Sequence, residues 1–240
     1  MTSLVRATGL ALAARLSPTD FASPGGELIA LVGPNGGGKT SLLRALAGVE
    51  AAAGAVAVGG EELDRVGEAR RRLLVALLPA SREVAWPIAV RDVIALGLRA
   101  SDPKRVEELI AAFELEPLAN RSIGAISTGE RARALMARAL AARPRLLLLD
   151  EPLANLDPYW VLRTLELLRA AASEGATVMV ALHDLAQIER FDRLLLLKDG
   201  QVKADGTPGD LKDQLGALFG VEATPEGWRI NRTAGPRSSP

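Results

Sequence analysis

The chain has 240 residues, of which 48% are hydrophobic and 24% charged, as expected for a globular protein with a buried core. Its 29 basic and 29 acidic residues cancel, which argues against the basic surface that nucleic-acid-binding proteins carry. The absence of cysteine excludes a disulfide framework and a thiolate metal site. No apolar run is long enough to span a bilayer and no signal peptide pattern is present, so we expect a cytoplasmic protein that works at a membrane only through partner chains.

The first elements lead to a glycine-rich segment. Residues 4–16 hold apolar residues with little period and are expected to form a strand, and residues 23–26 form a Pro-Gly turn. The apolar run 28–32 has the length of a buried strand. Residues 42–47 are typical of a helix that stops at Gly48.

Between that strand and that helix, the sequence fits the phosphate-binding pattern G-x-x-x-x-G-K-[ST] at every constrained position. Glycines let backbone N–H groups approach a phosphate, and the helix N-terminus adds partial positive charge. We expect Lys39 to reach the β- and γ-phosphates and the Thr40 hydroxyl to bind Mg²⁺. An accidental glycine-rich turn is the alternative, and the strand and helix flanks disfavour it. The residues expected to bind the nucleotide are Gly33, Pro34, Asn35, Gly36, Gly37, Gly38, Lys39, Thr40 and Ser41.

The middle of the chain changes from strand to helix patterns. Residues 54–60 predict short antiparallel strands, and residues 73–78 predict a strand stopped by Pro79. From residue 83 to residue 142 the pattern is helical, with an N-cap and first-turn proline at Asp102-Pro103. A helical insert is therefore expected between two strands of the core.

Four leucines, residues 146–149, lead into Asp150 and Glu151. A strand that is apolar on both faces belongs in the middle of a helix-covered parallel sheet, whose ligands bind beyond the carboxyl ends of the strands. We expect one of the two carboxylates, Asp150 or Glu151, to hold Mg²⁺, directly or through water, and the other to orient and deprotonate an attacking water. An acidic turn after a core strand is the alternative, and the phosphate-binding segment disfavours it.

A second strand leads to the only histidine of the chain. Residues 177–182 are apolar and deliver His183 to the edge where Asp150 is expected. A structural hydrogen bond is the alternative role for this imidazole, and its position at a strand end favours a functional one.

The elements around this strand complete the chain. A helix is predicted from Asp157-Pro158 to Gly175, and residues 194–204 predict a hairpin around Asp199-Gly200. The Pro-, Gly-, Ser- and Arg-rich tail from Thr224 is expected to be loose. The side chains of this helix expected to face inward are Val161, Leu162, Leu165 and Leu168.

Ile126-Ser127-Thr128-Gly129-Glu130 precedes another helix and contains a capping box. Such a helix N-terminus can also bind an anion. The phosphate-binding segment, this signature, the acidic strand, an aspartate loop at residues 154–157 and His183 follow one another along the chain. In the order and spacing of these motifs, residues 4–223 resemble the ATP-binding subunits of ABC transporters. The resemblance implies an α/β fold: a P-loop NTPase core with a mostly parallel sheet, a small antiparallel β part and a helical subdomain.

The resemblance also implies a domain organisation and an assembly. Residues 1–223 would form the ATP-binding domain, with residues 83–142 as the helical subdomain and residues 224–240 as a loose tail. Two copies would form a head-to-tail homodimer around two ATP molecules with Mg²⁺. Glu151 would be the general base, and His183 would contact the γ-phosphate. The phosphate-binding segment of one copy would face the signature of the other, namely Ser127, Thr128, Gly129 and Glu130.

Within the family, the segments 86–97, 197–200 with 206–208, and 218–221 look most like subunits that import iron-siderophore, haem or cobalamin. The helical subdomain would then contact an integral membrane permease on the inner face of the membrane, and a periplasmic solute-binding protein is a further candidate partner. Another solute is an alternative. A regulatory or structural subunit that binds ATP but hydrolyses it weakly is a second alternative. A soluble ABC-type ATPase of DNA repair or translation is disfavoured by the neutral charge and the single cassette.

The chain departs from the family pattern at four places. Ala80 stands where the family has a glutamine that contacts Mg²⁺ and links the insert to the core, and no aromatic residue lies near residues 10–15, where the family stacks a ring on adenine. Thr128 replaces the first signature glycine, and Ala154 replaces a serine of the aspartate loop. We therefore expect retained hydrolysis, altered coupling to the permease and weak discrimination between ATP and GTP.

Overall fold

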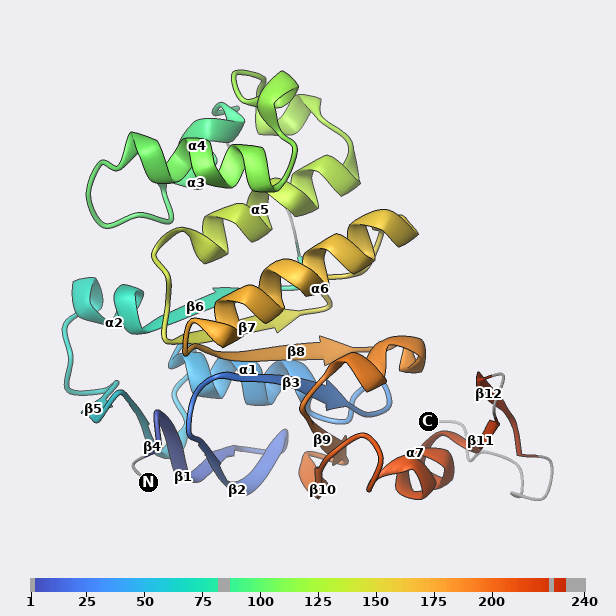
Figure 1. The fold of residues 1–240 in the computed structure, drawn as a ribbon. Coiled ribbons are helices and arrows are strands. Elements are labelled where there is room, and N and C mark those ends of the chain that lie inside the picture. The colour runs from blue at the N-terminus through green and yellow to red at the C-terminus, as the bar shows by residue number, and fades with distance from the viewer. Residues whose placement is uncertain (1–2, 82–86, 225–226, 232–240) are drawn as a thin grey trace.

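The computed structural model of the chain describes residues 3–81, 87–224 and 227–231 (Figure 1). The fold is α/β, and its centre is a six-stranded sheet with the order β10-β9-β3-β8-β7-β6. All pairings in this sheet are parallel except that between β9 and β10. The strands are β3 (Glu27–Val32), β6 (Val75–Leu78), β7 (Leu146–Asp150), β8 (Thr177–Leu182), β9 (Arg193–Lys198) and β10 (Gln201–Gly206).

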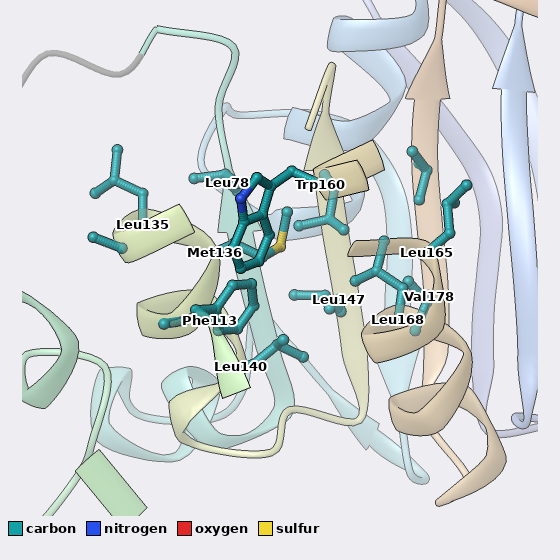
Figure 2. Packing of buried hydrophobic residues seen from close by; sticks show 14 of the residues in the cluster. Leu78, Phe113, Leu135, Met136, Leu140, Leu147, Trp160, Leu165, Leu168 and Val178 are labelled. Atoms are coloured by element: carbon teal, nitrogen blue, oxygen red, sulfur yellow. The ribbon is translucent and has the colours of Figure 1, made fainter. Parts of the chain in front are cut away.

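Side chains from both faces of this sheet are buried, as the unbroken apolar runs predict. In β7, Leu147 and Leu149 point into one hydrophobic core and Leu146 and Leu148 into the other. The first core lies under α6 (Pro158–Ser173), as Figure 2 shows. The second lies under α1 (Lys39–Ala47) and a separate antiparallel sheet. The strand ends are therefore fixed by packing on two sides.

The antiparallel sheet has the order β2-β1-β4-β5. One strand was predicted for residues 4–16, and this prediction was wrong at its C-terminal end. The chain turns after Leu12, where the Arg15 amide donates to the Leu12 carbonyl (3.1 Å) and Ala14 has φ 59°. The small side chains before Arg15 hid this turn because they are not typical turn formers. The strands are β1 (Val5–Leu12), β2 (Leu16–Ser23), β4 (Ala53–Val58) and β5 (Glu61–Glu62).

A helical segment lies between β6 and β7, as predicted, and Figure 1 shows it beyond α6. The predicted cap at Asp102 is confirmed, because its Oδ1 accepts a hydrogen bond from the Arg105 amide (3.0 Å). Part of the predicted insert, residues 83–86, falls outside the described residues. The helices of this segment are α3 (Val90–Ala95), α4 (Pro103–Ala112) and α5 (Thr128–Ala141), with short 3₁₀ turns at Glu116–Leu118 and Ile123–Ala125.

Two further sequence predictions, both about helix residues, need correction. Leu73 and Leu74 belong to α2 (Glu68–Leu74) rather than to β6. Leu162 is 41% exposed, because the buried stripe of α6 is centred on Trp160, Thr164 and Leu168 and position 162 lies beside it. In Figure 2, Trp160 and Leu168 point from this stripe into the core.

The C-terminal tail, predicted to be loose, contains a strand. β11 (Val221–Thr224) pairs with β12 (Gly227–Ile230) in an antiparallel hairpin, and Trp228 packs against the core. The Pro- and Gly-rich composition hid this short alternating segment. The elements before the hairpin are a 3₁₀ turn at Leu185–Arg190 and α7 (Lys212–Phe219).

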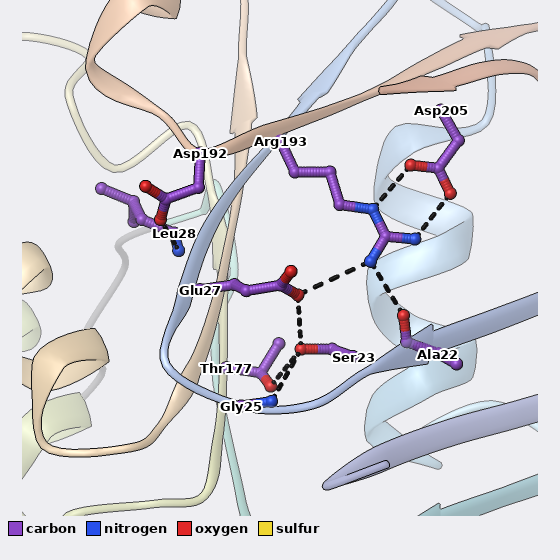
Figure 3. Close-up of polar contacts among 9 residues, drawn as sticks. All are labelled: Ala22, Ser23, Gly25, Glu27, Leu28, Thr177, Asp192, Arg193 and Asp205. Atoms are coloured by element: carbon purple, nitrogen blue, oxygen red, sulfur yellow. Dashed lines mark hydrogen bonds and ion pairs between the residues drawn. The ribbon is translucent and has the colours of Figure 1, made fainter. Parts of the chain in front are cut away.

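A polar network joins the antiparallel sheet to the central sheet (Figure 3). The Arg193 guanidinium donates to both carboxylate oxygens of Asp205 (2.6 Å each) and to the Ala22 carbonyl (2.9 Å). Nearby, the buried hydroxyls of Ser23 and Thr177 lie 2.8 Å apart. Because these groups come from segments far apart in the sequence, they fix the two sheets against each other.

The burial pattern predicts unequal costs for two leucine truncations. Leu147→Ala removes a side chain that is 0% exposed on β7, between β6 and β8, and should lower the free energy of unfolding by about 2–5 kcal/mol. Leu162→Ala is the matched control and should cost about 1 kcal/mol or less. Denaturant unfolding of the two variants measures the difference; equal losses would contradict this account of the core.

Candidate active site

The phosphate-binding segment forms a tight loop between β3 and α1. Gly36 and Gly38 have φ values of 76° and 103°, which favour glycine, and Gly38 caps α1. A Cβ on Gly33 would lie 2.1 Å from the carbonyl oxygen of Leu197. The loop is thus closed on the neighbouring strand β9, and its glycines are required by geometry.

Lys39, the first residue of α1, is only 7% exposed. Its Nζ donates to the carbonyl oxygens of Gly33 (2.6 Å) and Pro34 (3.1 Å). Burial lowers the pKa of Lys39, and the carboxylates of Glu151 and Asp150 act against this shift. A bound polyphosphate would stabilise the charged ammonium further, so this buried cation suits an anionic ligand.

Thr40 and Asp150 connect the loop to the acidic strand. The Thr40 hydroxyl donates to Asp150 Oδ2 (2.8 Å). Asp150 is 3% exposed, and its Oδ1 is buried without a hydrogen-bond partner in the described part of the chain. A hydroxyl beside a carboxylate with a free oxygen fits Mg²⁺, which takes one or two protein oxygens together with waters and substrate phosphates. The described residues contain no group of three or more candidate metal-ligating side chains.

Glu151 and His183 follow the ends of the neighbouring parallel strands β7 and β8. The register pairs Asp150 with Ala181, so the two side chains leave the same edge of the sheet. Glu151 Oε1 lies 2.5 Å from His183 Nε2. Glu151 has φ 52°, a left-handed conformation that turns the chain away as the strand ends. The geometry thus places a carboxylate and an imidazole in direct contact at the carboxyl edge of the sheet.

Lys39, Thr40, Glu151 and His183 line one cavity of about 560 Å³, whereas Asp150, Gly33 and Pro34 are not among its lining residues. Sequence reasoning missed four of its lining residues: Ala14 and Arg15 from the β1–β2 turn, and Asp199 and Gly200 from the β9–β10 turn. The sequence carried a signal for Asp199 and Gly200, because β9 is parallel to β3 and must end at the same edge of the sheet. The lining residues are Ala14, Arg15, Asn35, Gly36, Gly37, Gly38, Lys39, Thr40, Ser41, Glu151, His183, Asp199 and Gly200.

The signature segment lies elsewhere in the chain. Ser127 caps α5: its Oγ accepts from the Glu130 amide (3.3 Å), and its own amide donates to Glu130 Oε2 (2.7 Å). The capping-box prediction is therefore confirmed, and hydrogen bonding from Ser127, mainly from its backbone amide, lowers the pKa of the Glu130 carboxyl. A Cβ on Gly129 would lie 3.5 Å from the Asn155 carbonyl oxygen, so the signature borders the aspartate loop. None of Ser127, Thr128, Gly129 and Glu130 lines the cavity of its own chain.

The position of the missing glutamine is also outside the cavity lining. Ala80 and Ser81 are exposed and follow β6. Glu83, a side chain that could replace the glutamine, falls outside the described residues. Ser81, the described polar residue next to Ala80, does not line the cavity either.

The parallel sheet, the glycine loop with its buried lysine, and the acidic strand define a P-loop nucleoside triphosphatase. The sequence profile described as ABC transporter matches residues 16–154, more than half of the chain. The chain therefore belongs to the ABC transporter family and is one of its ATP-hydrolysing subunits.

Relatives of known identity agree with this assignment. The hemin import ATP-binding protein HmuV of Streptomyces coelicolor is 42% identical over 206 residues, which cover 82% of this chain and 74% of the relative. The cobalamin import ATP-binding protein BtuD of Halobacterium salinarum is 38% identical, covering 76% of this chain and 49% of the relative. A solved ATP-binding subunit of an ABC transporter superposes with a TM-score of 0.79 at 26% identity, covering 90% of this chain and 95% of that structure.

The contacts of Lys39 predict a loss of nucleotide binding on truncation. Lys39→Ala should weaken ATP binding, because the phosphates lose the buried cation of the loop, whereas the other cation of the described cavity lining, Arg15, is largely exposed and pairs with Glu50. Lys203→Ala removes an ammonium of β10 outside the cavity lining and is the control. Titration calorimetry gives both affinities; an unchanged ATP affinity for Lys39→Ala would refute the role of this side chain.

Proposed function

We propose that this ATPase energises the uptake of haem, or of a related iron or corrinoid complex, through a separate membrane permease. The ATPase part of this proposal rests on one observation: Lys39, Glu151 and His183 converge on one cavity at the carboxyl edge of the sheet. The solute is suggested by the relatives, which are hemin and cobalamin import ATP-binding proteins.

The residues of the cavity have distinct roles in this proposal. The loop amides and Lys39 hold the phosphates, and Thr40 and Asp150 hold Mg²⁺, which would neutralise charge on the β- and γ-phosphates. Glu151 orients and deprotonates the attacking water. His183 contacts the γ-phosphate and, through its bond to Glu151, keeps that carboxylate at the reacting end of the cavity.

A second copy of the chain completes the site. The signature, Ser127 to Glu130, presents a helix N-terminus with an exposed Ser127 and Thr128, yet it does not line the cavity of its own chain. A helix N-terminus favours an anion. In a head-to-tail homodimer, each signature would cover the γ-phosphate held by the loop of the other copy.

The membrane-spanning part of the transporter would be the permease. No helix within the described residues is both long and apolar enough to traverse a bilayer. We place the chain on the cytoplasmic face of the membrane, with residues 83–142 as the helical subdomain that contacts the permease and residues 1–82 and 143–223 as the catalytic core. A periplasmic solute-binding protein would deliver the solute. Uptake of hemin and of cobalamin, measured in turn with vesicles that contain the permease and this ATPase, distinguishes the candidate solutes.

A weakly hydrolysing subunit is the second candidate function. Two residues favour it: Ala80 has no group to contact Mg²⁺, and Ala154 lacks the hydroxyl of the family's aspartate loop. Such a subunit would bind ATP and dimerise with little turnover. The rate of phosphate release by the purified chain separates the two functions.

The role of Glu151 predicts the effect of an isosteric change. Glu151→Gln should still bind ATP but lose about 10²–10⁴-fold in hydrolysis, because the amide keeps the shape and removes the base. Phosphate release and ATP binding are measured on the same preparation. Glu189→Gln changes an exposed carboxylate outside the cavity and is the control. Hydrolysis by Glu151→Gln at the unmodified rate would show that another group is the base.

The alanine at position 80 predicts weak coupling between ATP hydrolysis and the permease, while ATP hydrolysis itself is retained. Ala80→Gln should increase the stimulation of ATPase activity by the reconstituted permease, with less effect on the basal rate of the isolated chain. Both proteins are compared in the same membrane preparation, with and without solute. Strong stimulation of the unmodified chain that Ala80→Gln leaves unchanged would show that another residue carries the signal between Mg²⁺ and the permease.

A further inference from the structure

The cavity extends to both sides of the phosphate loop. Glu151 and His183 follow β7 and β8, which lie on one side of β3 in the sheet order. On the other side lies β9, whose hairpin turn Asp199-Gly200 also lines the cavity, together with Arg15. The reacting phosphate is assigned to the first side, so the second side is where the base of a nucleotide would lie.

The backbone of Arg15 is fixed against the loop. A Cβ on Gly200 would lie 2.7 Å from the Arg15 carbonyl oxygen, and one on Gly38 would lie 3.4 Å from it. The Ser17 amide donates to the Gly200 carbonyl (2.8 Å), and the Gly200 amide donates to that of Gly37 (3.2 Å). The β1–β2 turn therefore has a set position at the cavity, and the side chain of Arg15 starts from a fixed point.

The guanidinium of Arg15 is also oriented. Its Nη2 donates to Glu50 Oε2 (2.6 Å), and Arg44 pairs with the other carboxylate oxygen of Glu50 (3.0 Å). The Arg15 side chain remains 54% exposed in this pair. Glu50 thus fixes the orientation of a planar cation while much of its surface stays open to a ligand.

No aromatic ring stands at this end of the cavity. Among the described residues that line it, none is Phe, Tyr, Trp or His except His183. Phe21 is 6% exposed, lies under the Arg193 guanidinium (5.3 Å) in the core and does not line the cavity. Arginine is the residue besides an aromatic one whose planar group stacks on a nucleobase.

We propose that Arg15, oriented by Glu50, is the platform on which the purine of the nucleotide stacks. The inference depends on the proposed nucleotide site and specifies how that site holds the base. Stacking on a guanidinium tolerates any base, because every base has a π-face. Arg15 therefore adds affinity for ATP and GTP alike and does not select between them.

The test compares ligands with and without a base, in a Glu151→Gln background that prevents turnover. Calorimetry measures the affinities for ATP, GTP and inorganic tripolyphosphate. Arg15→Ala should weaken ATP and GTP by about 5- to 140-fold and leave tripolyphosphate unchanged. Arg15→Tyr should retain most of the affinity for ATP, whereas Arg15→Lys, which keeps the charge but not the plane, should resemble Arg15→Ala. Arg44 also pairs with Glu50 but does not line the cavity. Arg44→Ala therefore removes a matched positive charge and should leave all three affinities unchanged.

Each other result overturns the proposal. An equal loss for ATP and tripolyphosphate would show that Arg15 contacts the phosphates. Affinity retained by Arg15→Lys and lost by Arg15→Tyr would show a purely electrostatic role, and unchanged ATP affinity in Arg15→Ala would exclude any role. If the Glu151→Gln parent bound neither ATP nor tripolyphosphate, the nucleotide site itself would be refuted, and the proposal for Arg15 with it.

Discussion

The hydrogen bond between Thr40 and Asp150 connects groups 110 residues apart, and the candidate site depends on the constraint that makes this bond possible. That constraint is the parallel register of β3, β8 and β7. Val32 pairs with Leu182, and Asp150 pairs with Ala181, so the three strands end within about one residue of the same edge. Each strand is followed directly by its functional group, and no long loop has to be ordered for them to meet.

The packing of the sheet also offsets the backbone strain and the burial of polar groups at its edge. A residue other than glycine in a left-handed conformation, such as Glu151, costs on the order of 1–3 kcal/mol. Lys39 is buried away from bulk water, and Asp150 keeps one oxygen without a hydrogen bond in the described part of the chain. Apolar cores on both faces of the sheet hold these groups in place. A bound nucleotide with its metal would place phosphates beside Lys39 and a cation beside the free oxygen of Asp150.

The sequence predicted the parts of the site that follow from a strand end, and it missed those that follow from a turn. Asp150 and His183 each come directly after an apolar run, so the rule for parallel sheets placed them correctly at one edge. Arg15 comes from a turn between antiparallel strands, and its approach to Gly38 depends on packing between the two sheets. Leu162 and the β12 strand were misjudged for a related reason: whether a helix position or a tail segment is buried depends on what packs against it. The roles of Glu151, His183 and the signature remain predictions that mutants must test.

The central claim of this account is that the nucleotide held by one copy is covered by the signature of another, and Thr128 tests it most directly. Thr128 is exposed in the first turn of α5, where a carboxylate suits the helix N-terminus but would repel a γ-phosphate. The measurement is sedimentation velocity with ATP in the Glu151→Gln background, with and without Thr128→Glu, and with Thr128→Gln as the uncharged control. The account predicts an ATP-dependent dimer that Thr128→Glu abolishes while ATP affinity of the monomer is unchanged. A dimer that survives Thr128→Glu, or a monomer that loses ATP affinity, would contradict it.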